Sequence, residues 1–513
     1  MYWLFHAACW GLLAGMTKHL RSQFSRRSFL AACLATAASP LLAAAPTVSL
    51  RPRLRGAVPD VADAVNEMLR ASRVTGQVAF AVADAKTGDI LEARNKAQGT
   101  APASVTKSIT ALYALDRLGS DHRFATRVVA AGRVNDGVLD GDLVLEGGCD
   151  PTLDTRALAD LAQQLKDSGL REVRGRFLVY ENALTPLHTI DPDQPDHLGY
   201  SPAVSGIALN YNRVHFEWKR NAGKYKITMD ARAAPYRPDV TIARMQIVER
   251  AAPVYTYDNA GDADHWSVAK GALGQEGARW LPVRHPGRYA GDVFATLARS
   301  QGIVLAVPEL VGTMPEGEVR ATVQSPPLRE IIQGMLKYSN NLTAEMVGLA
   351  ATRHTVARPQ TLAASARQMN LWAMASLGMT NPAFADHSGL GSASRVSPQD
   401  MVRALSAAHR DARLRPLLKP VRLLDKNGRT THKHPVKAVA KTGTLNFVSG
   451  LAGYITAPSG RELVFAIFCA DEEVRARITR ANRERPQGAR SWATRARRLQ
   501  RKLLARWGAV YAA

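Results

Sequence analysis

The chain has 513 residues, a formal net charge of +23, 46% hydrophobic residues and 22% charged residues. This length gives room for roughly two to four domains, and the composition is that of an ordered globular protein rather than a low-complexity chain. The four cysteines are widely spaced, which excludes a disulfide scaffold, and no CxxC or His/Cys cluster indicates a metal site.

Residues 1–45 are predicted to be an export signal. They contain basic residues and no acid, and residues 25–30 (SRRSFL) are typical of a twin-arginine signal. The alanine-rich apolar run at 31–42 is too short for a membrane anchor and ends in small residues that suit cleavage. An apolar stretch precedes the basic region, so translation is expected to begin at Met16; a conventional signal with a long front end is the alternative. Both readings predict a periplasmic protein.

Two strands and a helix are expected after the leader. The strands lie at 77–84 and 90–94 and are joined by a turn that contains Gly and Asp. The helix carries apolar residues at helical spacing from Val105 to Leu118 and is expected to end at Gly119.

Residues 128–322 are predicted to be inserted material that forms two small domains, with an inner part at about 203–275. Strand-like runs alternate here with turns, and they contain no nucleophile–base spacing. The expected elements are helices at 158–170 and 289–300, antiparallel strands at 207–218, 225–229 and 240–248, and further strands at 177–180 and 302–305.

The part after the insertion is expected to begin with a helix that Ser325 caps, with two prolines in its first turn. Further helices are expected from 342 and at 361–377, followed by a turn-rich loop at 386–390. Three closely connected strands then form an antiparallel meander. They are expected at 438–444, 450–455 and 463–469. Together with the first hairpin they predict one domain of about five strands with helices to either side, built from 46–127 and 323–470.

Chemistry is first indicated by Ser104 and Lys107, which are three residues apart and share one face of the predicted helix. A hydroxyl needs a neighbouring base to become a nucleophile, and a lysine can be that base only if its pKa is lowered. Unpaired N–H groups in a first helical turn also suit an oxyanion. Such a pair arises by chance on the order of once in a chain this long, so it is a hypothesis by itself.

Two more motifs follow in order, Ser339-x-Asn341 and Lys441-Thr442-Gly443-Thr444. The order SxxK, SxN, KTG marks serine acyl-transferring enzymes that recognise penicillin. Gly443 permits close approach of a strand that pairs with an extended peptide. Taken singly, the same residues also fit a helix cap, a helix-ending turn and an edge-strand charge.

The gap of 235 residues between Ser104 and Ser339 and that of 102 between Ser339 and Lys441 narrow the family, because compact β-lactamases have no such first gap. The pattern resembles the low-molecular-mass class C penicillin-binding proteins, the D-alanyl-D-alanine carboxypeptidase/endopeptidase family of the penicillin-binding protein 4 type. These proteins carry two extra domains between the first and second motifs. The likeness covers about residues 60–470 and includes similar stretches at 147–153, 289–294, 386–390 and 447–450.

The resemblance implies an α+β fold: a penicillin-binding, serine β-lactamase-like transpeptidase domain with a central antiparallel sheet flanked by helices, which carries a mostly β and α+β two-domain insertion. It implies hydrolysis of the bond between two D-alanines of peptidoglycan stem peptides through an acyl-enzyme, inhibition by β-lactams, and no cofactor or metal. The implied catalytic residues are Ser104, Lys107, Ser339, Asn341 and Lys441. The implied substrate-binding residues are Thr442, Gly443, Thr444 and Asp386.

The chain departs from the family pattern at three places. Cys149 stands where a third glycine is common, Arg395 is the first arginine after the 386–390 stretch, and Glu181 stands near an expected aspartate. In relatives the last two regions help to hold the polar end of the stem peptide's diamino acid, so the peptide preference stays open.

Several residues also have plain structural readings. A loop-forming carboxylate is as good an interpretation of Asp386 as a substrate contact, and His387 is expected on the surface. Asp150, before a proline, is expected to form a turn, and Cys149 is expected to be a small buried thiol.

The tail at 471–513 is strongly basic, with 12 Lys or Arg and one acid from Val474 onward. Its helical stripe of apolar residues fits a membrane surface or, as the favoured interpretation, packing on the catalytic domain. The stripe consists of Trp492, Ala496, Leu499, Leu503 and Trp507. The charge also suits anionic wall polymers, whereas nucleic acid is not an expected partner of an exported protein. A β-lactamase and a catalytically weak penicillin- or peptidoglycan-binding sensor or scaffold are the alternative functions.

Overall fold

The computed structural model describes residues 61–356, 361–425 and 427–512. Contacts divide the chain into Met1–Ala64 and Val65–Ala513, and the fold below is that of the second unit. The predicted export signal and the start at Met16 lie outside the described residues. Among the described helices none is both long enough and apolar enough to span a bilayer.

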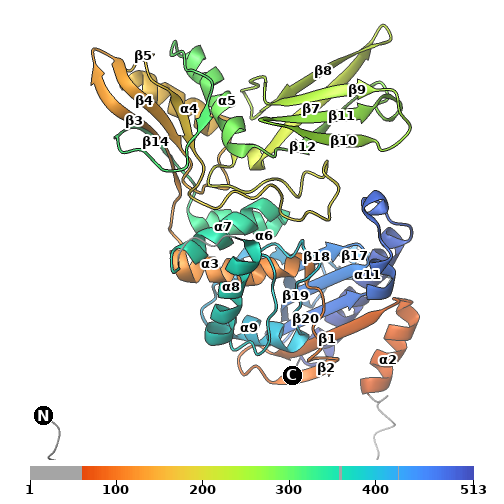
Figure 1. The fold of residues 1–513 in the computed structure, drawn as a ribbon. Helices are drawn as coiled ribbons and strands as arrows, with labels where there is room; N and C mark the ends of the chain where they lie inside the picture. Colours follow the sequence, from red (N-terminus) through yellow and green to blue (C-terminus); the bar gives the residue numbers. More distant parts are fainter. Residues whose placement is uncertain (1–60, 357–360, 426, 513) are drawn as a thin grey trace, which may run out of the picture. The chain divides into compact units, whose positions relative to one another are not determined.

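The centre of the catalytic part is a six-stranded sheet in which all pairings are antiparallel (Figure 1). Its order is β15 (Lys419–Pro420), β18 (Lys437–Leu445), β19 (Val448–Thr456), β20 (Glu462–Ala470), β1 (Gln77–Asp84) and β2 (Ile90–Arg94). The predicted hairpin and meander are confirmed. The pairing of β20 with β1 over the whole length of β1 joins segments from the two ends of the chain into one sheet.

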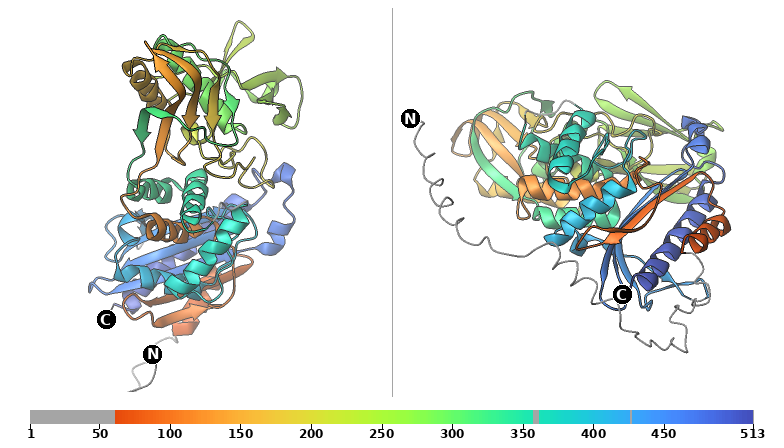
Figure 2. Two further views of the ribbon diagram at one scale, coloured as in Figure 1. Left: turned by 60° about the vertical axis from the view of Figure 1, so that its left-hand side comes forward. Right: turned by 90° about the horizontal axis from the view of Figure 1, so that it is seen from below.

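Helices cover both faces of this sheet (Figure 2). Alternate residues of β20 serve the two layers: Val464 and Ala466 face the larger group of helices, whereas Phe465 and Ile467 face α11. The larger group comprises α3 (Thr106–Leu118), α6 (Leu328–Tyr338), α7 (Asn341–Arg353), α8 (Leu362–Leu377) and α9 (Pro398–Arg410). The opposite face carries α11 (Ala489–Val510), whose apolar stripe is buried with the strands. The favoured interpretation of the tail is thereby confirmed, and the stripe has no apolar surface left for a membrane.

The insertion between α3 and α6 contains one six-stranded and two three-stranded sheets. The larger sheet comprises β3 (Ala125–Asn135), β4 (Val138–Glu146), β5 (Glu172–Val173), β6 (Phe177–Tyr180), β13 (Glu309–Leu310) and β14 (Glu318–Gln324), with helices α4 (Thr155–Asp167) and α5 (Pro286–Ser300). The smaller sheets are β12 (Glu276–Pro282), β7 (Arg213–Asn221) and β8 (Lys224–Asp230), and β10 (Tyr255–Ala260), β11 (Ala263–Ala269) and β9 (Ala243–Val248). One apolar cluster joins side chains of all three sheets.

The remaining elements are one helix before the first strand and several short helices, strands and turns. They are α2 (Val61–Ser72), α10 (Glu472–Ala476), β16 (Leu423–Leu424), β17 (Thr430–Thr431), and the 3₁₀ turns η1 (Ala103–Val105), η2 (Leu209–Tyr211), η3 (Lys270–Ala272), η4 (Arg415–Leu417) and η5 (Arg480–Asn482).

Three predictions for this part of the chain are wrong. No strand forms at 302–305, where the chain runs without regular structure until β13. The segment 240–248 contains β9, which pairs in parallel with β11 instead of antiparallel with a neighbour. Ser325 does not cap α6, because its hydroxyl accepts a hydrogen bond from the Phe124 amide and Pro327 takes the cap position.

Candidate active site

Ser104 lies in η1, directly before α3, in a turn that two other segments approach closely. A Cβ on Gly443 of β18 would stand 2.5 Å from the Pro102 carbonyl oxygen and 3.1 Å from the Ser104 amide nitrogen. A Cβ on Gly389 would stand 1.9 Å from the Ala103 carbonyl oxygen, and Gly389 has a φ of +71°. Glycine is therefore required on both segments that enclose the serine.

Lys107 joins the first and second motifs. Its Nζ lies 3.1 Å from Ser104 Oγ, 2.7 Å from Asn341 Oδ1 and 2.7 Å from the Ser388 carbonyl oxygen. The residue is completely buried. The base predicted from the SxxK spacing is thus in hydrogen-bonding contact with the predicted nucleophile.

Ser339 and Lys441 join the second and third motifs. Ser339 ends α6 in the left-handed conformation, with a φ of +58°, and Asn340 then caps α7 by accepting from the Thr343 amide. Lys441 Nζ donates to Ser339 Oγ at 2.9 Å and to the Thr442 carbonyl oxygen at 2.8 Å. The sharp change of direction between two helices therefore holds a second hydroxyl against a second buried lysine.

Burial weakens the positive charge of both lysines. It lowers the pKa of Lys107 to about 8, although nearby Glu345 and Asp386 act in the opposite direction. The pKa of Lys441 is lowered well below its usual value, first by burial and then by the charge of Lys107. The lowered pKa values make a neutral amine next to a hydroxyl accessible at mildly alkaline pH, which is the condition for general-base activation of serine.

The outer edge of β18 is open where a substrate would bind. Within the described residues β15 pairs with β18 only at Ala440 and Val439, which leaves the edge from Lys441 onward without a strand partner. Thr442 and Thr444 are exposed there, while Gly443 between them is buried. An extended peptide can add to such an edge through its main-chain hydrogen bonds. The described residues contain no cluster of three or more His, Cys, Asp or Glu suited to a metal ion.

Comparison with protein families gives a match between residues 61–487 and the D-Ala-D-Ala carboxypeptidase 3 (S13) family. The chain belongs to this family. It is a serine-type D-Ala-D-Ala carboxypeptidase, as the ordered motifs predicted, and the predicted α+β fold with its inserted domains is confirmed.

Relatives support the assignment over most of the chain. The D-alanyl-D-alanine carboxypeptidase of Actinomadura sp. (strain R39) is 27% identical over 470 residues, which cover 83% of this chain and 86% of the relative. The D-alanyl-D-alanine carboxypeptidase DacB of Haemophilus influenzae is 24% identical over 71% of this chain and 79% of its own length. The crystal structure of penicillin binding protein 4 from Haemophilus influenzae superposes with a TM-score of 0.69 at 20% identity, and covers 86% of this chain and 99% of that chain.

All five residues of the 386–390 loop of this carboxypeptidase are buried, including Asp386 and His387. The Asp386 carboxylate is 4% exposed and accepts hydrogen bonds from the amides of Gly389 at 2.6 Å and Gly391 at 2.7 Å. This is the geometry of a loop-forming carboxylate, and its substrate contact stays a prediction. His387 was predicted on the surface, which is wrong: it is fully buried, and its Nε2 lies 2.7 Å from Ser365 Oγ.

Glu345 is a buried residue of the site that was not predicted from the sequence. This carboxylate is fully buried and accepts hydrogen bonds from the amides of His387 at 3.0 Å and Ser388 at 2.9 Å. The available signal was its position, because it is the only acid in the otherwise largely apolar α7 and lies one turn after Asn341.

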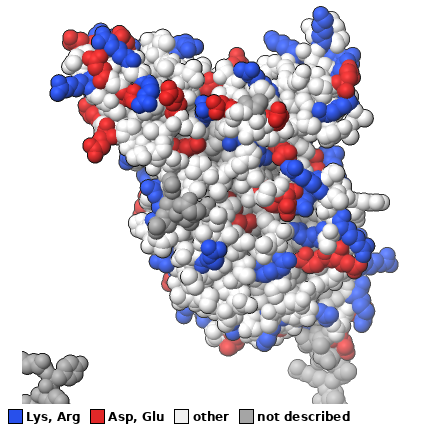
Figure 3. Space-filling view, viewed as in Figure 1, with Lys and Arg blue, Asp and Glu red and all other residues white. Residues whose placement is uncertain are grey.

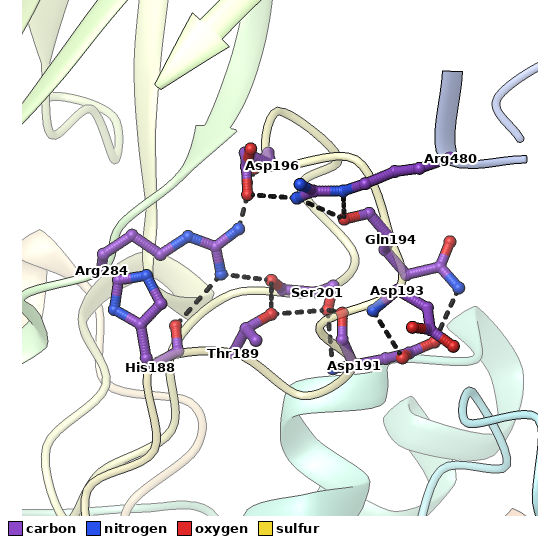
Figure 4. A network of polar contacts seen from close by, with 9 residues as sticks. All are labelled: His188, Thr189, Asp191, Asp193, Gln194, Asp196, Ser201, Arg284 and Arg480. Atoms are coloured by element: carbon purple, nitrogen blue, oxygen red, sulfur yellow. Dashed lines mark hydrogen bonds and ion pairs between the residues drawn. The ribbon is translucent and has the colours of Figure 1, made fainter. Parts of the chain in front are cut away.

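The inserted loop at 185–203 of the carboxypeptidase also reaches the site. The Tyr200 carbonyl oxygen accepts a hydrogen bond of 2.9 Å from Asn341 Nδ2. Buried Arg284 donates to three carbonyl oxygens of this loop, and Arg480 donates to a fourth and pairs with Asp196 (Figure 4). Two arginines thus fix the loop that contacts a residue of the second motif.

The positions that depart from the family pattern have internal partners. Glu181 is 9% exposed and accepts a hydrogen bond from the Gly287 amide. Arg395 lies 3.7 Å from Glu472 and donates to the carbonyl oxygens of Ser392 and Ser394. Cys149 is buried, as expected.

Proposed function

We propose that Ser104 attacks the carbonyl carbon between two C-terminal D-alanines of a peptidoglycan stem peptide, with Lys107 as the general base. The observation that carries this proposal is the contact of a fully buried lysine amine, 3.1 Å away, with the hydroxyl it has to deprotonate. The family assignment gives the reaction class, and the geometry gives each residue its part in it.

Acylation proceeds in two proton transfers. Lys107 takes the proton of Ser104 as Oγ bonds to the carbonyl carbon, and the main-chain amides of Ser104 and Thr444 stabilise the oxyanion. When the C–N bond breaks, the Ser339 hydroxyl gives its proton to the departing amine and takes up the proton that Lys107 removed from Ser104, while Lys441, 2.9 Å away, holds that hydroxyl in place. Water then attacks the ester and restores the serine.

The substrate's orientation follows from these roles. The leaving D-alanine lies toward Lys441 and Ser339, where the hydroxyls of Thr442 and Thr444 can receive its carboxylate. The acyl part lies along the free edge of β18, and the Asn341 amide holds its backbone. Nothing in this arrangement separates a terminal D-alanine from one that belongs to a crosslink, so the proposal includes endopeptidase activity.

β-Lactams are proposed to acylate Ser104 by the same attack. A solved structure of penicillin binding protein 4 from Haemophilus influenzae, complexed with a β-lactam, superposes on this chain with a TM-score of 0.67 at 20% identity. That structure supports the fold of the site, and the proposal for this chain rests on its own serine and lysines.

The protein is proposed to act in the periplasm, after export by the predicted twin-arginine signal. Its net charge of +23 favours anionic wall polymers or a membrane surface. On the face in Figure 3, basic side chains are interspersed with acidic ones, so no single basic patch dominates that face. Because the apolar stripe of α11 is buried, this helix could associate with a membrane surface only through its basic side chains.

Purified crosslinked muropeptides test the proposal. Wild-type protein should release free D-alanine, monomers from dimers, or both, as detected by mass spectrometry, and should be labelled covalently by a fluorescent penicillin. Ser104→Ala should do neither, because it lacks the nucleophile. A wild-type protein that is folded yet releases no product and takes up no label would contradict the proposed function.

A further inference from the structure

The buried carboxylate of Glu345 is not used in the reaction as described above, although it lies next to the catalytic residues. It is one helical turn beyond Asn341 on α7, so the two side chains share a face of the helix. Its two oxygens accept from consecutive amides of the 386–390 loop, those of His387 and Ser388. Burial, and then the charge of Asp386, raise the pKa of Glu345 to about 8, whereas the two N–H donors of the loop and the charge of Lys107 act in the opposite direction.

Glu345 and Lys107 hold opposite sides of the same loop residue. The Ser388 amide donates to Glu345 at 2.9 Å, and the Ser388 carbonyl oxygen accepts from Lys107 at 2.7 Å. The other short hydrogen bond of Lys107 is to Asn341 Oδ1, also at 2.7 Å. Helix α7 therefore positions both acceptors of the short hydrogen bonds of Lys107. It carries Asn341 itself, and through Glu345 it holds the loop residue Ser388.

These two contacts determine where the lone pair of a neutral lysine points. The Asn341 amide oxygen and the Ser388 carbonyl oxygen can only accept hydrogen bonds. A neutral amine has two N–H bonds, and both are taken by these acceptors. Its lone pair is then left for the third neighbour, the Ser104 hydroxyl at 3.1 Å.

We propose that Glu345 is a positioning residue for acylation: it fixes the Ser388 carbonyl and so directs the lone pair of Lys107 to Ser104. The inference rests on the proposed function, because it concerns the same serine and the same base. It adds a residue outside the three motifs and gives the loop's main chain a role in the reaction.

Other charged groups face this cluster from the loop and the neighbouring elements. Asp386 lies on the loop and acts on both Glu345 and Lys107, and Asp191 of the insertion acts on Asp386. Lys441 on β18 is affected by the charge of Lys107. Burial lowers the pKa of His387 to about 3, so this residue stays neutral throughout the relevant range.

The sign of the expected effect follows from these charges. Glu345 raises the pKa of Lys107 against the larger, opposite effect of burial, and the result is about 8. Replacing Glu345 with a neutral residue removes one of the two carboxylates that raise it. The pKa of Lys107 should therefore fall, and neutral Lys107 should become available at lower pH.

The experiment measures the rate of covalent labelling by a fluorescent penicillin from pH 6 to pH 10 in wild type, Glu345→Gln, Glu345→Asp and Thr110→Val. Thr110→Val is the matched uncharged control, because the Thr110 hydroxyl anchors the same loop by donating to the His387 carbonyl oxygen at 2.6 Å. Circular dichroism establishes that each variant is folded.

Glu345→Gln should move the alkaline limb of the profile toward acid by up to about one pH unit, because Glu345, with its raised pKa, is only partly ionised where Lys107 titrates. Its plateau should fall, because the amide NH₂ would face an N–H donor of the loop. Glu345→Asp should keep the limb of the wild type with a lower plateau, since the shorter side chain retains the charge but draws back from Ser388. Thr110→Val should leave the limb in place.

A limb that stays fixed in Glu345→Gln would overturn the inference, as would a wild-type plateau in Glu345→Asp. The second result can be read even if Glu345→Gln does not fold. Both outcomes leave the proposed function intact, because the wild type would still be acylated. A wild type without labelling at any pH would instead refute the proposed function itself.

Discussion

Removal of the Trp507 side chain should unfold the catalytic domain far more readily than any change on the exposed face of α11. Trp507 is fully buried, and its ring lies 5.5 Å from Phe80 and 6.4 Å from Phe465 between centroids. Its Nε1 also donates to Glu92 at 2.9 Å. Trp→Ala at such a position costs about 3–5 kcal/mol of unfolding free energy, because the space left behind cannot be refilled.

The comparison with Arg497→Ala makes the prediction specific. Arg497 is exposed on the same helix, and a surface change of this kind costs about 0.5 kcal/mol or less. Urea unfolding, followed by loss of penicillin labelling, should show a much lower midpoint for Trp507→Ala and an unchanged midpoint for Arg497→Ala. Equal midpoints would refute the packing of α11, as would a blue shift of tryptophan fluorescence when liposomes are added to the wild type.

Three further predictions concern the site. The acylation rate should rise about tenfold between pH 7 and pH 9, because the pKa of Lys107 is lowered to about 8 and only the neutral amine can take the proton; a flat rate over this range would contradict its role as base. Gly443→Ala should nearly abolish penicillin labelling, since the new Cβ would stand 2.5 Å from the Pro102 carbonyl oxygen, and labelling at the wild-type rate would disprove this close approach. Arg284→Met should slow labelling by roughly ten- to a hundredfold, because the loop that carries the Tyr200 carbonyl loses three hydrogen bonds, and a folded variant with the wild-type rate would show that the loop does not position the site.

The catalytic motifs were predictable because each one consists of a few residues close together in the sequence, and the three motifs follow one another in a fixed order. Ser104 and Lys107 are three residues apart, in η1 and in the first turn of α3 that follows it directly, so local geometry alone brings them together. The strands of the meander were equally accessible, since β19 and β20 are buried along almost their whole length and are therefore continuous apolar runs.

Glu345 and His387 could not be assigned in this way, because their partners are distant in sequence. A buried polar side chain is read from the groups that satisfy it, and those of Glu345 are main-chain amides more than 40 residues away. The residues next to His387 in the sequence do not indicate that its ring nitrogen will form a hydrogen bond with Ser365. The sequence pattern reports burial for apolar residues only, so His387 was predicted on the surface and Glu345 was not singled out.

The failed strand at 302–305 illustrates a different limit. Ile303 and Leu305 are buried and Val304 between them is 66% exposed, so the side chains alternate between core and solvent as they would in a strand. No hydrogen-bonded strand partner is present, because alternation determines which side chains face the core and does not determine whether a neighbouring strand is available. The parallel pairing of β9 with β11 is the same kind of fact, set by distant chain segments.

The failed cap at Ser325 explains how a long insertion fits between two motifs of one active site. The chain leaves the catalytic domain at 120–125 and returns at 324–329, and hydrogen bonds join these two segments along their length. The Ser325 amide donates to the Phe124 carbonyl oxygen, and the Phe124 amide donates to the Ser325 hydroxyl. The amides of Leu328 and Arg329 donate to the carbonyl oxygens of His122 and Ser120. Because exit and return are paired, the ends of α3 and α6 are held together whatever lies between them, and the closure of a long loop adds little further entropic cost. Ser104 and Ser339 can therefore be 235 residues apart in sequence while Lys107, between them in space, contacts both motifs. The serine that looked like a helix cap is part of the closure that makes this possible.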